Sequence, residues 1–174
     1  MMPRIAAGFA LFLFASACDR TDQPDPLTPP SDTGPDECVT TPNLVATIRV
    51  SASTNSGSID VLVYSDGSAE RTIGPPLSVG GNGAAPDPKS YAAGSPEVMT
   101  FLADLALAGD VAAIPTATIH DPGSGCAKSA SFGNITALTV DCSTSGDLQC
   151  LAPPATAEAT ALAHDCDVLS GRRS

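Results

Sequence analysis

The stretch IDVLVYSDGSAERTI, residues 59–73, decides the fold of this chain. Residues 59–64 and 69–73 flank the polar segment SDGS. Asp66-Gly67 is the strongest turn signal in the sequence, because a type I′ turn needs positive φ angles and glycine adopts them at low cost. The stretch therefore predicts a β-hairpin.

The segments on either side of the hairpin differ in character. Residues 44–53, LVATIRVSAS, alternate between an apolar and a polar face, which predicts a half-buried strand. Residues 74–94 are rich in glycine and proline and predict a long irregular loop. A loop of that length in a compact domain is either functional or disordered. The apolar face of the strand consists of Leu44, Ala46, Ile48 and Val50.

Two helices are expected farther along the chain. Residues 95–109 begin with Ser95 as an N-cap, followed by a proline and an acid that suit a first helical turn, and Gly109 suits the end. Residues 155–169 are rich in alanine and follow two prolines. The core-facing side chains are expected to be Val98, Phe101, Leu102 and Leu105 in the first helix and Leu162, Cys166 and Leu169 in the second.

The residues between the two helices predict further strands. Residues 111–119 are apolar and β-branched but contain Pro115, which suits an edge strand or an extended connection. Residues 128–132 and 135–141 predict two strands around a Gly-Asn turn. The order strand, hairpin, helix, strands, helix predicts an α+β fold. In it, a small antiparallel sheet carries two helices packed on one face, and disulfides staple the domain.

The N-terminal residues 4–18, RIAAGFALFLFASAC, have the features of an export signal. One positive charge precedes a run of roughly 10 apolar residues, whereas a membrane-spanning helix needs roughly 20. The ending ASAC resembles the lipobox of bacterial lipoproteins, although Ala15 stands where leucine is commonest. The resemblance implies that residues 1–17 are a signal peptide and that Cys18 becomes a lipidated N-terminus. The other interpretation is an ordinary secretory cleavage site beside an incidental cysteine.

The lipoprotein interpretation also sets the domain organisation. Residues 18–37 are expected to be a lipidated tether rich in Pro, Asp and Thr, with too few large apolar residues to become ordered. Residues 38–170 are expected to form a single domain, followed by a C-terminal tail at residues 171–174. The protein would lie in the cell envelope, attached through its lipid to the inner or outer membrane, with an envelope protein as a candidate partner. Asp19 resembles an inner-membrane retention signal of some Gram-negative bacteria.

The composition narrows the function classes. The 174 residues carry a net charge of −11, without a basic stripe, which argues against nucleic-acid binding and against electrostatic docking on anionic lipid. Aromatic residues make up only 4% of the chain, which disfavours carbohydrate stacking and large-ligand pockets. The clustered pair Arg172-Arg173 is interpreted as part of a solvated tail. Glu70 and Arg71, on opposite faces of the hairpin, are interpreted as surface charges.

Six cysteines in an exported chain predict disulfides. Lipidation of Cys18 would leave an odd number. We expect Cys38 to be unpaired or loosely placed; an intermolecular bridge is the other interpretation. A hairpin over residues 128–141 would bring Cys126 near Cys142, which makes that pair a candidate bridge. The four cysteines expected to pair among themselves are Cys126, Cys142, Cys150 and Cys166.

Candidates for catalysis are few. The chain has two histidines, His120 and His164, and no G-x-S-x-G nucleophile motif. The run HDCD at residues 164–167 offers four metal-ligand types, but adjacent residues of a helix point in different directions, so we predict no metal site and no cofactor. The sequence favours a non-catalytic binding or envelope-associated module. The alternative is a small exported hydrolase-like enzyme that uses His120 or His164, with a Ser, Cys or carboxylate in hydrogen-bond reach.

Overall fold

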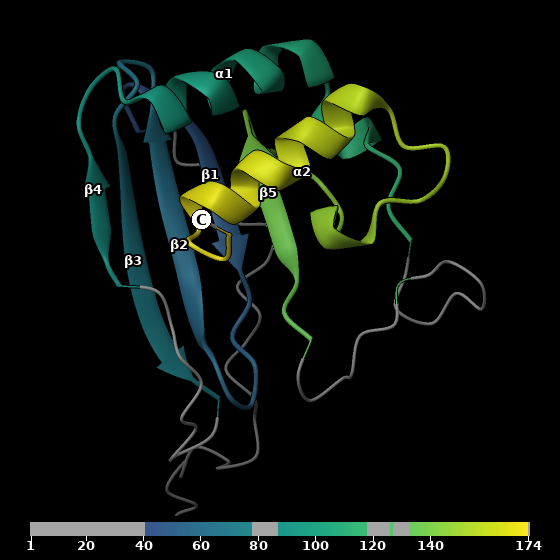
Figure 1. Ribbon diagram of the computed structural model, residues 1–174, viewed down its shortest axis with the longest axis horizontal. Coiled ribbons are helices and arrows are strands. Elements are labelled where there is room, and N and C mark those ends of the chain that lie inside the picture. Colours follow the sequence, from purple (N-terminus) through teal and green to yellow (C-terminus); the bar gives the residue numbers. More distant parts are fainter. Residues whose placement is uncertain (1–40, 78–86, 118–125, 127–132, 174) are drawn as a thin grey trace, which may run out of the picture. The chain divides into compact units, whose positions relative to one another are not determined.

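The computed structural model describes residues 41–77, 87–117, 126 and 133–173 (Figure 1). Within them, six antiparallel strands form one sheet in the order β4-β3-β2-β1-β5-β6. Both helices cover the same face of this sheet, which confirms the predicted α+β fold. The elements are β1 (Leu44–Val50), β2 (Gly57–Tyr64), β3 (Ala69–Pro76), β4 (Lys89–Tyr91), α1 (Pro96–Ala108), the 3-10 turn η1 (Val111–Ala113), β5 (Thr136–Val140), β6 (Ser143–Thr144), the 3-10 turn η2 (Leu148–Cys150) and α2 (Ala157–Leu169).

The centre of the sheet is β1, which pairs with β2 on one side and with β5 on the other. Ile48 lies opposite Val61 of β2 and Leu138 of β5, and all three side chains are fully buried. Ala46 and Val50 are buried on the same face, which confirms the predicted alternation of this strand. The core therefore lies between this face of the sheet and the two helices.

The hairpin of β2 and β3 is confirmed, but its turn is not type I′. Type I′ requires positive φ at both central residues, and here Gly67 has a φ of 78° whereas Asp66 has no positive φ. The N–H of Gly67 donates to the carbonyl of Tyr64 (3.1 Å). The Asp66 carboxylate accepts from the N–H of Ser68 (2.9 Å), an Asx-type bond that stabilises this other turn geometry.

The segment predicted as a long loop contains β4. Lys89 lies opposite Arg71 and Tyr91 lies opposite Ala69 on β3, so the segment adds a short edge strand. A three-residue strand is too short for its alternation to stand out beside glycine and proline. The start of the predicted loop is also wrong, because residues 74–76 belong to β3, where they continue the pairing with β2. Residues 78–86 lie outside the described residues.

Arg71 is not the surface charge that the sequence suggested. Its side chain lies in the inward row of β3, opposite Val61, and only 7% of the residue is exposed. Its Nε and Nη2 donate to the carbonyl of Asp87 (2.9 and 2.6 Å), and its Nη1 donates to the carbonyl of Leu169 at the end of α2 (3.3 Å). The hydroxyl of Tyr91 donates to the same Leu169 carbonyl (3.3 Å). A buried cation therefore ties the hairpin to the negative end of the helix dipole.

Helix α1 occupies the predicted segment, although Ser95 does not cap it as expected. The Ser95 hydroxyl donates to the carboxylate of Glu97 (3.0 Å) rather than accepting from a backbone N–H of the first turn. The predicted inward face is confirmed for Val98, Phe101 and Leu105, which are buried.

Helix α2 also matches its prediction and packs against α1. It is capped by Thr156, whose hydroxyl accepts from the N–H of Ala159 (3.1 Å). The predicted inward residues Leu162, Cys166 and Leu169 are fully buried, so this face completes the core.

The connection before β5 differs from the expectation. Residues 111–113 form η1, capped by Asp110, whose carboxylate accepts from the N–H of Ala112 (3.0 Å). Thr116 forms an isolated bridge with Leu151 instead of an edge strand. The strand predicted over residues 128–132 lies outside the described residues.

One disulfide joins Cys126 to Cys150, with the two Cα atoms 5.2 Å apart. This confirms a disulfide staple but not the Cys126–Cys142 pairing, because the end of η2, rather than the turn after β5, approaches Cys126. Cys142 is also disulfide-bonded, and its partner lies outside the described residues. Cys166 is a free, buried thiol, so its expected bridge is wrong: the inner face of α2 places it among core side chains. Cys38 lies outside the described residues.

Candidate binding groove at the end of helix α2

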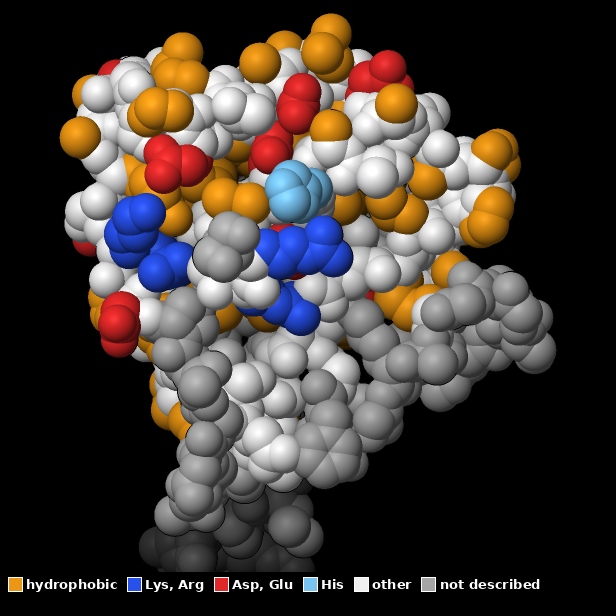
Figure 2. All heavy atoms as spheres, in the orientation of Figure 1, with side chains coloured by type: hydrophobic (Ala, Val, Ile, Leu, Met, Phe, Trp, Pro, Cys, Tyr) orange, Lys and Arg blue, Asp and Glu red, His pale blue; other side chains and the backbone are white. Residues whose placement is uncertain are grey.

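A groove of about 1110 Å³ lies along α2, beside η2 and the residues that follow the helix. Figure 2 shows blue Lys and Arg side chains gathered beside the pale-blue histidine on this face, with orange apolar side chains around them. The groove therefore combines an apolar lining with a concentrated polar end. Its polar lining includes Gln149, His164, Asp167, Arg172 and Arg173.

The backbone after α2 places the two arginines at the groove. Gly171 has a φ of 75°, and its N–H donates to the carbonyl of Val168 (3.0 Å). The N–H groups of Arg172 and Arg173 both donate to the carbonyl of Asp167 (2.8 and 3.2 Å). The Gly171 and Arg172 bonds are the Schellman motif that ends helices at a glycine. The segment therefore turns back onto the helix, although residues 171–173 remain exposed.

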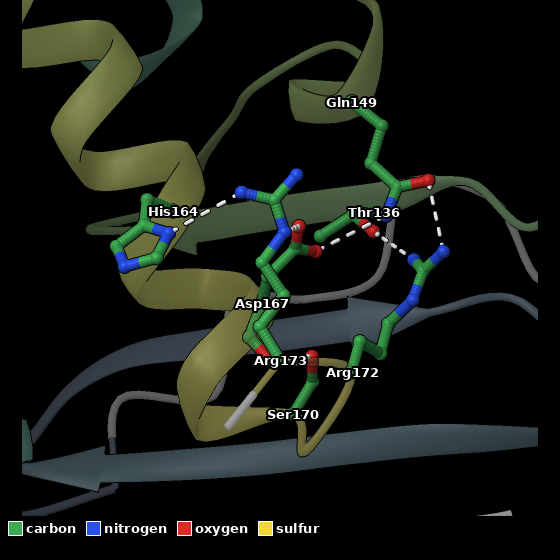
Figure 3. Close-up of polar contacts among 7 residues, drawn as sticks. All are labelled: Thr136, Gln149, His164, Asp167, Ser170, Arg172 and Arg173. Carbon is green, nitrogen blue, oxygen red and sulfur yellow. Dashed lines mark hydrogen bonds and ion pairs between the residues drawn. The ribbon is translucent and has the colours of Figure 1, made fainter.

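Arg172 is held by two neutral acceptors. Its Nη1 donates to the hydroxyl of Thr136 on β5 (2.9 Å), and its Nη2 donates to the side-chain carbonyl of Gln149 on η2 (3.0 Å), as Figure 3 shows. Thr136 is fully buried, which makes it a fixed anchor for the guanidinium. The side chain of Arg172 thus joins the chain end to the sheet and to η2.

Arg173 lies between Asp167 and His164 (Figure 3). Its Nε is 3.5 Å from a carboxylate oxygen of Asp167, and its Nη1 is 3.4 Å from Nδ1 of His164. The other oxygen of Asp167 accepts from the amide of Gln149 (3.1 Å). Gln149 therefore contacts both Asp167 and Arg172, and the polar end of the groove forms one connected network.

The charges of this network do not cancel. Asp167 is the carboxylate that pairs with Arg173, and its side chain is only 14% exposed. No described carboxylate forms an ion pair with Arg172, whose side-chain bonds go to a hydroxyl and an amide. The groove thus carries a net positive charge on a chain whose total charge is −11.

His164 lies in the groove, but the contact described for it does not suit acid–base catalysis. A guanidinium only donates, so Nδ1 of His164 acts as the acceptor from Arg173. Hydrolysis would instead call for a nucleophile or a carboxylate at this distance. His120, the other histidine candidate, lies outside the described residues.

The HDCD run behaves as helix geometry predicts. His164 lines the groove, Asp167 pairs with Arg173, and Cys166 is buried in the core. Asp165 contacts α1 instead, because its carboxyl group is hydrogen-bonded to Asp104. The four side chains therefore do not converge on one point.

A different trio, Cys126, Asp147 and Cys150, has its ligand atoms within 4.8 Å of one another. The two sulfurs are bonded to each other, so neither is available as a thiolate. The Asp147 carboxylate accepts from the N–H groups of Thr136 (3.0 Å) and Gln149 (3.2 Å). These three residues therefore act as a disulfide and a backbone hydrogen-bond acceptor, and not as a set of metal ligands.

Comparison with known proteins identifies no relative: no family model, curated protein or solved structure matches this chain significantly. Neither of the helices in the described part of the chain is long and apolar enough to cross a bilayer.

Sequence reasoning found His164 but missed the rest of the groove. Gln149 and Thr136 carried no signal, because their roles depend on contacts with a residue 23 and 36 positions away, respectively. Gly171 was a usable signal: a glycine directly after a helix suits the Schellman position, and it would have predicted that the arginines fold back.

Proposed function

We propose that this protein is a cell-envelope lipoprotein whose folded domain is a non-catalytic binding module that uses the groove at the end of α2. The observation that carries the binding role is the guanidinium of Arg172, fixed by Thr136 and Gln149 without a described carboxylate partner. Fixing a charged donor before the ligand arrives lowers the entropy cost of binding. The groove supplies the adjoining apolar surface that ligand sites commonly have.

The exported-enzyme alternative is less well supported. The contact described for His164 is an arginine, which acts neither as a nucleophile nor as a base at neutral pH. Catalysis would also require a second acid or base close to the substrate, and the Asp167 carboxylate is already engaged by Arg173 and Gln149.

The proposed anchor rests on the lipobox-like ending at Cys18 and on the acidic, proline-rich segment that follows it. The described cysteines add a constraint. Cys142 is disulfide-bonded to a residue outside the described part, where the chain has two cysteines, Cys18 and Cys38. A sulfur that carries the lipid as a thioether cannot form a disulfide, so lipidation of Cys18 predicts that Cys142 is bridged to Cys38.

The anchor is tested by intact mass and disulfide mapping of protein from the membrane fraction. We expect a chain that begins at Cys18, carries acyl groups, and yields a peptide in which Cys142 is linked to Cys38. A Cys18–Cys142 peptide, or an unmodified Cys18 at the N-terminus, would refute the lipoprotein.

The binding role is tested separately by site-specific photocrosslinking in cells. A photoreactive residue at Thr160, which lines the groove, should give a discrete crosslinked product. The same residue at Thr72, on the exposed face of β3, is the control and should give none. Equal crosslinking at the two positions would contradict a binding role for the groove.

A further inference from the structure

We infer that the groove binds an aliphatic carboxylate, with Arg172 and Arg173 as the groups that receive the carboxylate and the small apolar side chains beside them as the seat for its carbon chain. The carboxylate comes from a free organic acid or from the C-terminus of a peptide. This inference rests on the proposed binding role and specifies its ligand.

The donors of Arg172 are only partly used. A guanidinium has five N–H groups, and the described side-chain bonds of Arg172 use one from Nη1 and one from Nη2. Both acceptors are uncharged, so these bonds orient the cation without neutralising it. Carboxylates and phosphates both match the remaining planar donors in geometry and in charge. The apolar side chains beside the arginines favour the carboxylate of an aliphatic molecule.

Arg173 supplies the second set of donors. Its Nε faces Asp167 and its Nη1 faces His164, while no bond of the described residues uses its Nη2. Its side chain is 62% exposed. The guanidinium is therefore steered by its neighbours yet open toward solvent, where an incoming anion can reach it.

The positions of both arginines are set before a ligand binds. The Schellman turn at Gly171 fixes their backbone, and the buried Thr136 fixes the head group of Arg172. Because these groups are already ordered, binding a ligand costs less side-chain entropy.

Because the whole chain is acidic, an anion is not attracted to its surface in general and binds only where local contacts favour it. A protein with a charge of −11 repels anions at long range, so binding of an anion has to come from short-range contacts. The two C-terminal arginines are the cations that line this groove. Removing either one should therefore have a large effect on binding.

The apolar lining indicates the rest of the ligand. Leu151, Ala157 and Ala161 line the groove together with the arginines. Small aliphatic side chains leave room for an unbranched or alanine-like carbon chain but offer no aromatic surface for stacking a ring. The matching ligand has a short aliphatic body that ends in a carboxylate.

The test is equilibrium dialysis of the full mature protein, held in nanodiscs of zwitterionic lipid, with empty nanodiscs subtracted. The probes are radiolabelled hexanoate, its neutral isostere hexanamide, and acetyl-trialanine with a free or an amidated C-terminus. We expect at least one carboxylate to bind about tenfold or more tightly than its amide. Binding of hexanoate points to a free acid, and binding of the free-terminus peptide alone points to a peptide end.

Three variants assign the binding to the groove. Arg172→Gln and Arg173→Gln should each weaken carboxylate binding about tenfold or more, because each removes a charge-assisted donor pair. Arg49→Gln is the matched control, since Arg49 is an exposed arginine of β1 that pairs with Asp60 (2.8 Å), and it should leave binding unchanged. Arg173→Gln keeps the Arg172–Thr136 bond, so it remains informative if Arg172→Gln unfolds.

Equal binding of acids and amides, or equal loss in the Arg49 control, would overturn the carboxylate inference. If no carboxylate binds while the Thr160 crosslink persists, the ligand class is wrong and the binding role stands. If the crosslink is absent as well, the proposed function fails with it.

Discussion

The carboxyl group of Asp165 on α2 is hydrogen-bonded to the carboxyl group of Asp104 on α1. Asp165 is only 8% exposed, and its Oδ2 has no hydrogen-bond partner among the described residues. Burial, together with the neighbouring Asp104, raises the pKa of Asp165 from 3.8 to about 6. A hydrogen bond between two carboxyl groups needs a proton, so the contact between the helices is complete only when one of them is protonated.

We predict that the stability of the fold decreases between pH 4 and 7 because of this pair. The folded state holds the Asp165 proton more tightly than the unfolded state. The stabilisation is therefore full below the unfolded pKa near 3.8 and is lost as the pH rises through about 6. Asp165→Asn keeps the shape and supplies a permanent donor to Asp104. It should raise the free energy of unfolding at pH 7 by roughly 1 kcal/mol or more.

The measurement is denaturant unfolding of both proteins at a series of pH values. Asp165→Asn also removes the attraction between Asp165 and His164, which opposes the pKa shift, so the difference between the two proteins reports the net of both interactions. The difference between variant and wild type should grow from pH 4 to pH 7. A difference independent of pH would show that Asp165 and Asp104 do not share a proton.

Cys166 should be unreactive in the native protein. It is fully buried, and burial, together with the neighbouring Asp165 and Asp167, raises the pKa of its thiol. Iodoacetamide should not modify it over hours under native conditions but should modify it completely in denaturant. Mass spectrometry of the peptide that contains Cys166 reads this directly, with Cys166→Ala as the control. Rapid native labelling would mean that α2 opens or is placed differently.

Removing the Cys126–Cys150 bridge should destabilise the protein by about 3 kcal/mol. The two cysteines are 24 residues apart, and a loop of that size restricts the unfolded chain by roughly this amount. The double variant Cys126→Ser/Cys150→Ser should therefore unfold at lower denaturant concentration with a similar dependence on denaturant. An unchanged midpoint would place the bridge elsewhere.

Arg71→Ala should destabilise the fold by about 3 kcal/mol, because it leaves the carbonyls of Asp87 and Leu169 without their charged donor. Tyr91→Phe removes a single bond to the Leu169 carbonyl and should cost about 1 kcal/mol. Glu70→Ala, on the exposed side of the same strand, is the control and should change stability by less than about 0.5 kcal/mol. Similar losses for Arg71 and Glu70 would contradict the buried role of the arginine.

The sheet and helices were predictable because their signals are local. The alternation of β1, the Asp66-Gly67 turn and the apolar face of α2 each lie within a few consecutive residues. The role of Arg71 was not predictable, since its acceptor Leu169 is 98 positions away and only the folded sheet brings them together. From the sequence, alternation alone could not tell an inward arginine from an outward one.

In the candidate site too, local features were predictable and long-range contacts were not. His164 could be named as a polar residue of interest, but its neighbour Arg173 could be placed only once the helix end was known. The cysteine pairing also depended on the folded arrangement, because Cys126 meets η2 rather than the turn after β5.

The edges of the sheet are its shortest strands, with three residues in β4 and two in β6. Beyond β4, the uncovered part of β3 ends in Pro75 and Pro76, which have no N–H to offer a neighbouring strand. Long, regular edges invite a second molecule to add its own strand, the first step toward fibrils and other insoluble assemblies. Because its edge strands are short and β3 ends in two prolines, this sheet resists the addition of a strand from another molecule.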